Sequence, residues 1–423
     1  MSTAESNVSK GSDDSGASRL FGQIFHAVLP AALLAIAVGQ IYAFTIFSDD
    51  IAARIGSSKS QVQFAFSLGI FFLGMGAAFF GRIVEKNIKL STAIGTVLFL
   101  AGLCTTACAV KSRSLALLYL GYGFLVGTGT GVIYISPVKT MMLWFERHKA
   151  VAAAIPIISF GLGSSVCKLL HTALAPHCPV PADFVPEGVK CSVDTVRMFL
   201  LLAAAYAGPM VLGNLLLRKP RTALAAAAAR SSGFRYAAIL RQKYFLRCWL
   251  FMFLNISCGL CLIPLAKQMM NDPSVGYSKG LIDWIIVLCG LMNGGGRFLF
   301  AWWSDRLARR INIMLVILGI SAGIMTASFW PPVIGFALLV INACYGAGFS
   351  VIPAILSDHY GMTDISKIHG AVLSAWGVAG IVGNQAAILV SDKLGFGYYG
   401  VVTMLVVFYS LNILNVLALR KVR

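Results

Sequence analysis

Twelve apolar runs divide this sequence, and each is about as long as a helix that crosses a lipid bilayer. About 20 residues of α-helix span a hydrocarbon core of about 30 Å. Because the runs are continuously apolar rather than alternating, they exclude a membrane β-barrel. The sequence therefore predicts an all-α membrane protein with twelve spans. They cover residues 25–47, 61–81, 90–110, 115–138, 149–169, 196–217, 245–266, 280–303, 311–329, 331–355, 368–390 and 398–419.

The composition agrees with this interpretation. Hydrophobic residues make up 58% of the chain and charged residues only 12%, whereas about 25% of the residues of a soluble domain are charged. The net charge of +18 at first suggests a nucleic-acid partner. However, 23 of the 34 Lys and Arg residues fall on the side of the N-terminus, 10 fall on the other side and Arg297 lies within a span. Excess positive charge on one side is typical of cytoplasmic loops, so we expect cytoplasmic termini and no nucleic-acid partner.

The predicted organisation is two halves joined by a basic linker. Residues 1–24 form a polar, Ser-rich tail that we expect to be disordered, and without an apolar core this tail is not a cleavable signal peptide. Residues 25–217 and 245–419 each hold six spans, residues 218–244 are the cytoplasmic linker, and residues 420–423 are a second cytoplasmic tail.

Corresponding features recur at nearly constant distances along the two halves, which predicts two related six-helix bundles. Carriers built in this way bind substrate near the membrane midplane, between the repeats. The recurring features are an acidic residue after the second span, a Tyr-Gly pair and a glycine-rich turn of helix. The pairs are Glu85 and Asp305, Tyr122 and Tyr345, and Gly161 and Gly377, at offsets of 220, 223 and 216 residues.

The short turn with an acid and several basic residues resembles the signature of the major facilitator superfamily. The second copy, WWSDRLARR, contains Asp305, Arg306 and Arg310 and is the better match; the first, GRIVEKNIK, has Glu85 but lacks the paired arginines. The resemblance implies two pseudo-symmetric six-helix bundles. We interpret the turn as a cytoplasmic latch, in which basic groups hold a carboxylate at a helix end. The alternative is a solvated basic loop, and for the first copy the sequence favours neither.

Arg297 is a cation inside the eighth span, where a charge costs about 2.5–3.5 kcal/mol on insertion scales and usually marks function. Trp303, near the end of the span, is about 9 Å away along the helix, so the side chain could snorkel to the interface. Helical side chains lean toward the N-terminus, however, which points Arg297 to the membrane centre. The residue four before it is the neutral Asn293. We expect Arg297 to bind an anion, which could approach it over Gly294–Gly296 because these residues have no side chains. Snorkelling and structural pairing are the alternatives.

Other polar or aromatic residues lie at comparable depth in spans of both halves. Each of them taken alone favours helix packing over a ligand contact, because a single Gln can bond a neighbouring helix, but together they favour a site because they come from both halves. The candidates are Gln40 and Tyr42 in the first span, Tyr134 in the fourth and Trp376 in the eleventh.

Several stretches resemble one branch of the superfamily, the oxalate/formate antiporter family, to which the monocarboxylate transporters are related. They are GQIYAFTIF, GTGTGVIYISPVKTMMLWFERHKAVAAAI, NGGGRFLFAWWSDRLAR and YGAGFSVIPAILSDHYG with IHGAVLSAWGVAGIVG. The resemblance implies that Arg297 binds a substrate carboxylate and that Tyr42 and Tyr134 line the site. The second cation of the oxalate site, a lysine, is replaced by Trp376, which favours a monocarboxylate. At the position of Asn293, monocarboxylate transporters have an aspartate that carries the proton. Asn293 cannot titrate and so cannot take this role.

The function predicted from these residues is transport of a small monocarboxylate, such as formate, lactate or pyruvate, by alternating access. Alternatives are an oxalate or other dicarboxylate exchanger, a carrier of a neutral solute with a structural Arg297, and a non-transporting membrane sensor. Clustered nucleophiles or metal ligands are absent from the spans, so we expect no enzyme, cofactor or metal site. We expect a monomer in the plasma membrane or the bacterial inner membrane.

Two cysteines, Cys178 and Cys191, lie in the long outer loop with twelve residues between them. An oxidising face would allow a disulfide between them, and two free thiols are the alternative. The neighbouring His171 and His177 lack the spacing of a metal site.

Overall fold

A computed structural model describes residues 20–174, 194–220 and 236–422, and these residues are almost entirely helical. Eleven helices in them are long and apolar enough to cross a membrane, and the apolar helix Ile311–Ala327 is shorter. Together they correspond to the twelve predicted spans, so the predicted fold class is confirmed. In the N-terminal half the elements are η1 (Ile24–Val28), α2 (Leu29–Gly39), η2 (Gln40–Ile46), α3 (Ser48–Ile55), α4 (Lys59–Lys86), α5 (Ile88–Lys111), α6 (Leu115–Leu118), η3 (Tyr119–Val126), α7 (Gly127–Trp144), α8 (Lys149–Leu174) and α9 (Thr195–Leu216).

The C-terminal half repeats this pattern of long helices. Its elements are α11 (Tyr236–Leu240), α12 (Lys243–Met270), α13 (Lys279–Ser304), α14 (Ile311–Ala327), η5 (Pro331–Val333), α15 (Ile334–Tyr360), α16 (Ile365–Ile388), η6 (Leu389–Lys393) and α17 (Gly397–Leu419).

Local sequence explains where several of these helices begin. The Ser58 hydroxyl accepts the backbone N–H of Gln61 while the Gln61 side chain accepts the N–H of Ser58, a reciprocal cap at the start of α4. Asn87 and Ser278 accept backbone N–H groups in the first turns of α5 and α13. These caps satisfy backbone donors that a membrane-spanning helix leaves free at its N-terminus.

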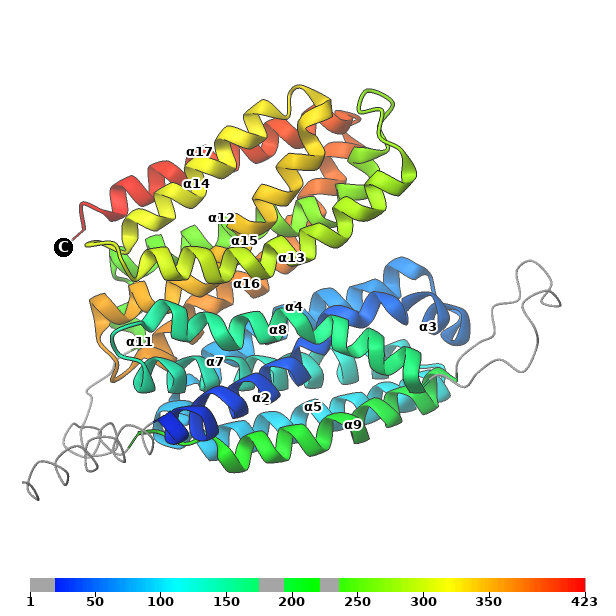
Figure 1. Cartoon of the computed structure of the whole chain (residues 1–423). Helices are drawn as coiled ribbons and strands as arrows, with labels where there is room; N and C mark the ends of the chain where they lie inside the picture. Colours follow the sequence, from blue (N-terminus) through cyan, green and yellow to red (C-terminus); the bar gives the residue numbers. More distant parts are fainter. Residues whose placement is uncertain (1–19, 175–193, 221–235, 423) are drawn as a thin grey trace, which may run out of the picture.

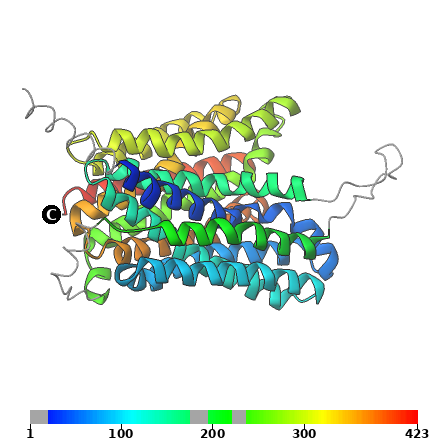
Figure 2. The same ribbon diagram turned by 60° about the horizontal axis from the view of Figure 1, so that its bottom comes forward.

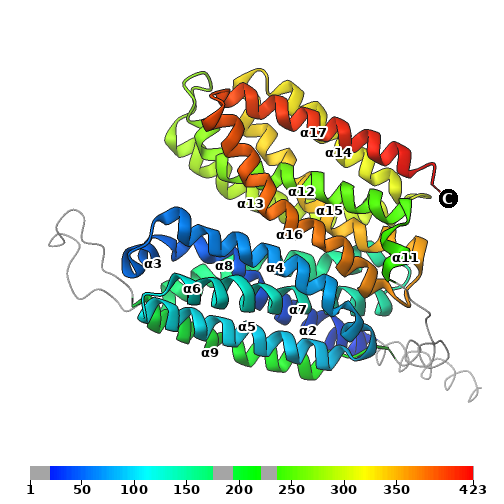
Figure 3. The ribbon, with the colours of Figure 1, turned by 180° about the vertical axis from the view of Figure 1, so that it is seen from behind.

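The helices form two bundles that run roughly parallel to one long axis (Figures 1 and 2). The bundles meet at the end that carries the C-terminus and diverge toward the end that carries α3 (Figures 1 and 3). We call these the closed end and the divergent end. Many large apolar side chains, such as Leu291 at 66% exposed, face outward, which suits a surface solvated by lipid.

Between the bundles, α16 lies along α4 and α13 lies along α8 (Figures 1 and 3). Glycines allow the first pair to approach closely. A Cβ atom added at Gly74 would lie 2.7 Å from the Leu373 carbonyl oxygen, and one at Gly370 would lie 2.1 Å from the Ala77 carbonyl oxygen. Small residues that bring backbones together are typical of helix contacts in membranes, and here they hold the two bundles against each other.

The predicted disulfide and the predicted end of the fourth span have different outcomes. Cys178 and Cys191 lie outside the described residues, so the disulfide stays a prediction. The fourth span was predicted to end at residue 138, but α7 continues to Trp144. Lys139, which we assigned to a loop, is therefore a buried helical residue. The prediction stopped at the first charge of the run and missed that a partner can keep a lysine inside a helix.

Candidate functional site

Arg297 lies at the interface between the bundles and is 5% exposed. Its Nε donates to the Asn293 side-chain oxygen at 3.0 Å, and its Nη1 donates to the backbone carbonyl of Ile157 on α8. The guanidinium therefore lies toward the preceding turn of α13 rather than snorkelling to the closed end. Both hydrogen-bond partners are neutral, so the buried positive charge is solvated by dipoles but not neutralised.

Six aromatic rings form one cluster beside this guanidinium, and we call them the aromatic cage. Tyr42, Tyr134 and Tyr345 lie within electrostatic range of Arg297, and its Cζ atom is 5.7 Å from the centroid of the Phe349 ring. All of the rings except Tyr42 are buried. Three come from the first bundle (Tyr42, Tyr134, Phe160) and three from the second (Tyr345, Phe349, Trp376).

Trp376 holds the cage together across the interface. Its ring centroid lies 4.6 Å from that of Phe349 within its own bundle, and 5.5 Å and 5.8 Å from those of Tyr134 and Phe160 in the other. Tyr42 completes the contact at 6.4 Å. Edge-to-face and offset rings at these distances attract one another, so the six rings form one packed cluster that spans both bundles, with the Arg297 guanidinium beside it.

The glycine that clears the approach to Arg297 differs from our prediction. Added Cβ atoms at Gly294 and Gly295 would meet nothing within 4 Å, and one at Gly296 would strike the Ala343 backbone of α15. Gly296 therefore serves packing within the second bundle. The glycine beside the guanidinium is Gly161 of α8, which is exposed and whose added Cβ would lie 3.4 Å from Nη1.

The structure brings together most, but not all, of the predicted binding residues. Arg297, Asn293, Tyr42, Tyr134 and Trp376 meet at one place. Gln40 does not: it is buried beside Tyr122 inside the first bundle, without a hydrogen bond of normal geometry. Residues two positions apart on a helix point to roughly opposite sides, so Gln40 faces the interior of the first bundle while Tyr42 faces the cage.

Sequence reasoning missed three members of the cage, namely Phe160, Tyr345 and Phe349. Their signal was present, because SFGLG and YGAGFSVIP were the stretches that revealed the internal repeat. Carriers of two bundles bind substrate at the interface between the repeats. Phe160, Tyr345 and Phe349 lie there, whereas Tyr122, the counterpart of Tyr345, is buried inside the first bundle.

At the closed end, Asp305 at the end of α13 caps the start of α8 in the other bundle. Its carboxylate oxygens accept the backbone N–H groups of Ala150 and Val151 at 3.1 and 3.0 Å. Arg310 holds the same carboxylate at 3.1 Å and also contacts Asp358 at 2.6 Å. A carboxylate at a helix N-terminus also benefits from the helix dipole. We call this group the Asp305 latch.

Glu85 at the end of α4 makes the mirrored contact, which we call the Glu85 latch. Its carboxylate accepts the backbone N–H of Ser366 in the first turn of α16 at 2.7 Å and pairs with Lys139 of α7. Both side chains of that ion pair are less than 10% exposed. Lys219 donates to the Glu85 backbone carbonyl at 3.0 Å, and burial lowers the pKa of Lys219.

The latches differ from the sequence prediction in their cations. Arg306 does not hold Asp305; its Cζ atom lies 3.5 Å from the centroid of the Trp302 ring instead. For the first copy, the missing arginines of the turn are replaced by Lys139, which comes from another helix. The two copies of the motif thus have equivalent acids but unrelated basic partners.

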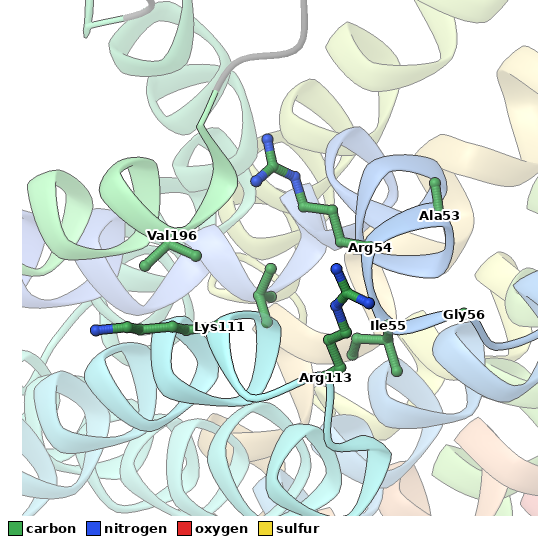
Figure 4. Close-up of a pocket in the computed structure, with 8 residues that line it drawn as sticks. Ala53, Arg54, Ile55, Gly56, Lys111, Arg113 and Val196 are labelled. Carbon is green, nitrogen blue, oxygen red and sulfur yellow. The ribbon is translucent and has the colours of Figure 1, made fainter.

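A pocket lined by three cationic side chains lies elsewhere. It has a volume of about 430 Å³ and lies at the divergent end of the first bundle, beside α3 (Figure 4). Arg54, Lys111 and Arg113 line it, but Lys111 extends away from the two arginines (Figure 4). Arg54 also pairs with Asp50 and Asp194. Because these cations do not converge, the pocket does not compete with the cage as an anion site.

Comparison with known proteins agrees with this architecture. The family profile described as "Major Facilitator Superfamily" matches residues 28–384 and 248–420. The chain belongs to the major facilitator superfamily. It is 25% identical to the uncharacterized MFS-type transporter YhjX of Escherichia coli over 82% of this chain and 83% of that protein. It is 23% identical to the oxalate:formate antiporter of Oxalobacter formigenes over 91% and 89% of the two chains.

More distant similarities lie within the same superfamily. Mouse monocarboxylate transporter 11 is 24% identical over 71% of this chain and 66% of that protein. Among solved structures, the proton:xylose symporter XylE superimposes with a TM-score of 0.71 at 14% identity, over 96% of each chain; at this identity the similarity establishes the fold alone. The chain is therefore a multi-pass membrane transporter of the major facilitator fold, and not an enzyme.

Proposed function

We propose that this transporter carries a small organic monocarboxylate, of the size of formate, lactate or pyruvate, by alternating access. The observation that supports the proposal is the buried guanidinium of Arg297, held by neutral partners in a cage between the bundles. A carboxylate would pair with it through two parallel hydrogen bonds, replacing the Ile157 carbonyl. Two relatives are named as an oxalate:formate antiporter and a monocarboxylate transporter, and both names agree with a carboxylate substrate.

The number of cations favours one carboxylate over two. Among the described residues of the cage, Arg297 is the one charged side chain. The second buried cation, Lys139, is paired with Glu85 at the closed end. A monoanion would leave the cage neutral. A dianion would leave one negative charge to be buried without a partner, which costs several kcal/mol. Trp376, at the position of the family's second cation, would be an apolar wall.

The latches would set the conformational state. The excess of Lys and Arg would place the termini in the cytoplasm, so that the closed end would be cytoplasmic and the divergent end would face outside. The Glu85 and Asp305 carboxylates would hold the cytoplasmic ends of the bundles together while substrate enters over Gly161. Opening toward the cytoplasm would break both contacts, as expected for rocking of one repeat against the other. We expect a monomer in the plasma or bacterial inner membrane.

The proposal is tested by counterflow in proteoliposomes that contain the purified protein. Labelled formate, lactate, pyruvate and oxalate are offered outside against an unlabelled excess of the same compound inside. The matched variants are Arg297→Ala and Arg306→Ala, since each removes one guanidinium from the same helix region, but only Arg297 lies in the cage. We expect counterflow of a monocarboxylate in the parent and in Arg306→Ala, and its loss in well-folded Arg297→Ala.

A carrier of a neutral solute is the second candidate, because the Ile157 carbonyl and Asn293 already occupy donors of Arg297. In that case Arg297 would be structural. Folded and inserted Arg297→Ala that exchanges every carboxylate as fast as the parent would exclude the carboxylate site.

A further inference from the structure

Trp376 carries a hydrogen-bond donor that nothing in the structure satisfies. The side chain is 1% exposed, and its indole nitrogen is buried without a hydrogen-bond partner among the described residues. The ring lies among Tyr42, Tyr134 and Phe160 on one side and Phe349 on the other. The unmet N–H group therefore lies within the wall of the cage, not at a lipid-facing surface.

Buried donors in native proteins are nearly always paired, and an exception calls for an explanation. An indole N–H can only donate, so the missing partner is an acceptor. The neighbouring rings of Phe160 and Phe349 offer no lone pair, and the hydroxyl groups of Tyr42 and Tyr134 do not accept this N–H in the described structure. Phenylalanine at position 376 would supply the same apolar wall without a donor, so packing alone does not explain the indole nitrogen.

We infer that Trp376 selects substrates with an oxygen on the carbon next to the carboxylate, that is, 2-oxo or 2-hydroxy monocarboxylates. This inference rests on the proposed function, in which Arg297 takes the carboxylate itself. The indole N–H then donates to the second oxygen. Formate and acetate have no such oxygen, and a monocarboxylate of equal length without it leaves the donor buried and unpaired.

Near the cage, the imidazole Nε2 of His369 is also buried without a partner among the described residues and is the alternative selecting group. His369 precedes Trp376 by seven residues on α16, which places it on the same face of the helix but about 10 Å closer to the closed end. A ligand of two or three carbons held by Arg297 would not reach both groups. The His369 ring lies 6.4 Å from that of Tyr134, whereas Trp376 contacts four rings of the cage, so we assign the selection to Trp376.

Pyruvate and propionate are the probes that isolate this hydrogen bond. Both are three-carbon monoanions of nearly equal size, and only pyruvate has an acceptor on C2. Each competes, unlabelled, against labelled pyruvate exchange in proteoliposomes of the intact protein. We expect pyruvate to compete about tenfold better than propionate in the parent, the equivalent of about 1.4 kcal/mol. Lactate, which also has an oxygen on C2, should likewise compete better than propionate.

The variant Trp376→Phe removes the N–H group and keeps an aromatic wall, so the pyruvate-to-propionate ratio should fall to about one. The matched control is Trp284→Phe, which makes the same substitution at an exposed position of α13 and should keep the parent ratio. Equal competition by propionate and pyruvate in the parent overturns the inference, and so does an unchanged ratio in Trp376→Phe. Neither result touches the proposed function, which fails only if Arg297-dependent exchange of carboxylates is absent.

Discussion

The aromatic cage and the two latches join the same two bundles with buried charges, but they do so in opposite ways. Each latch carboxylate has a cationic partner and also caps a helix of the other bundle. Arg297 in the cage has only the neutral Asn293 oxygen and the Ile157 carbonyl. Paired charges hold two surfaces together, whereas a charge without a counter-ion favours an anion from solution. The comparison separates residues that hold the transporter shut from the residue that we propose binds substrate.

The latches themselves differ in how deeply their ion pairs are buried. Lys139 and Glu85 are 6% and 9% exposed, while Arg310 is 18% exposed and shares Asp358, itself 41% exposed, as a second acid. Removing an acid therefore leaves a buried lysine in one latch and a paired arginine in the other. The copy with the weaker sequence motif should be the more sensitive to mutation.

The largest expected effect is on folding, from Glu85→Gln. This change leaves Lys139 buried without a counter-ion, which costs about 3–5 kcal/mol. We expect a lower melting temperature in detergent and less inserted protein. The double variant Glu85→Gln with Lys139→Met removes both charges and should recover most of the loss. A stable Glu85→Gln protein would show that Lys139 is not confined to this pair.

The next effect concerns transport, from Arg297→Lys. Lysine keeps the charge but not the planar fork that pairs with a carboxylate through two hydrogen bonds. Loss of the whole interaction costs about 2–5 kcal/mol, roughly 30- to 4,000-fold in affinity, so the lysine variant should fall between the parent and Arg297→Ala. The measurement is concentration-dependent counterflow of the transported monocarboxylate. Equal rates for the lysine and alanine variants would mean that charge alone contributes nothing at this position.

A third prediction concerns the number of charges in the cage. Trp376→Lys adds a second cation across the cage from Arg297 and also shortens the side chain. We expect oxalate to compete at least about tenfold better against the labelled monocarboxylate, a change of about 1.4 kcal/mol. The parent should prefer the monocarboxylate. An unchanged oxalate ratio in the variant would show that position 376 does not face the bound substrate.

The smallest effect should come from Asp305→Asn in the second latch. The amide oxygen still accepts one backbone N–H of α8, and Arg310 keeps Asp358, so the loss should be about 1 kcal/mol, typical of a weakened helix cap. This would increase opening of the closed end about fivefold. Maleimide labelling of a cysteine at Ala154, which is buried against Ala301, measures that opening over the background of the native cysteines. Labelling that rises more than in Glu85→Gln would reverse the order of the two latches.

How far the sequence predicts this protein depends on the range of the interaction involved. The spans followed from hydropathy alone, because a helix in lipid must be apolar over its whole length. The position of Arg297 was equally visible as a charge in an apolar run, and helix geometry predicted its direction toward Asn293. The internal repeat indicated two related bundles before any contact was known.

Only the tertiary structure showed which further residues complete the site. Phe160 and Phe349 are 189 positions apart in the sequence, yet both contact Trp376, because the bundles meet along α8, α15 and α16. Gln40 and Tyr42 are two residues apart and therefore lie on different sides of one helix, and only the packing of the neighbouring helices shows that the Tyr42 side faces the cage. Lys139 was assigned to a loop because its partner Glu85 lies on another helix. Hydropathy and periodicity describe one helix at a time, whereas the counter-ion of a buried charge and the walls of a cage come from several helices packed together.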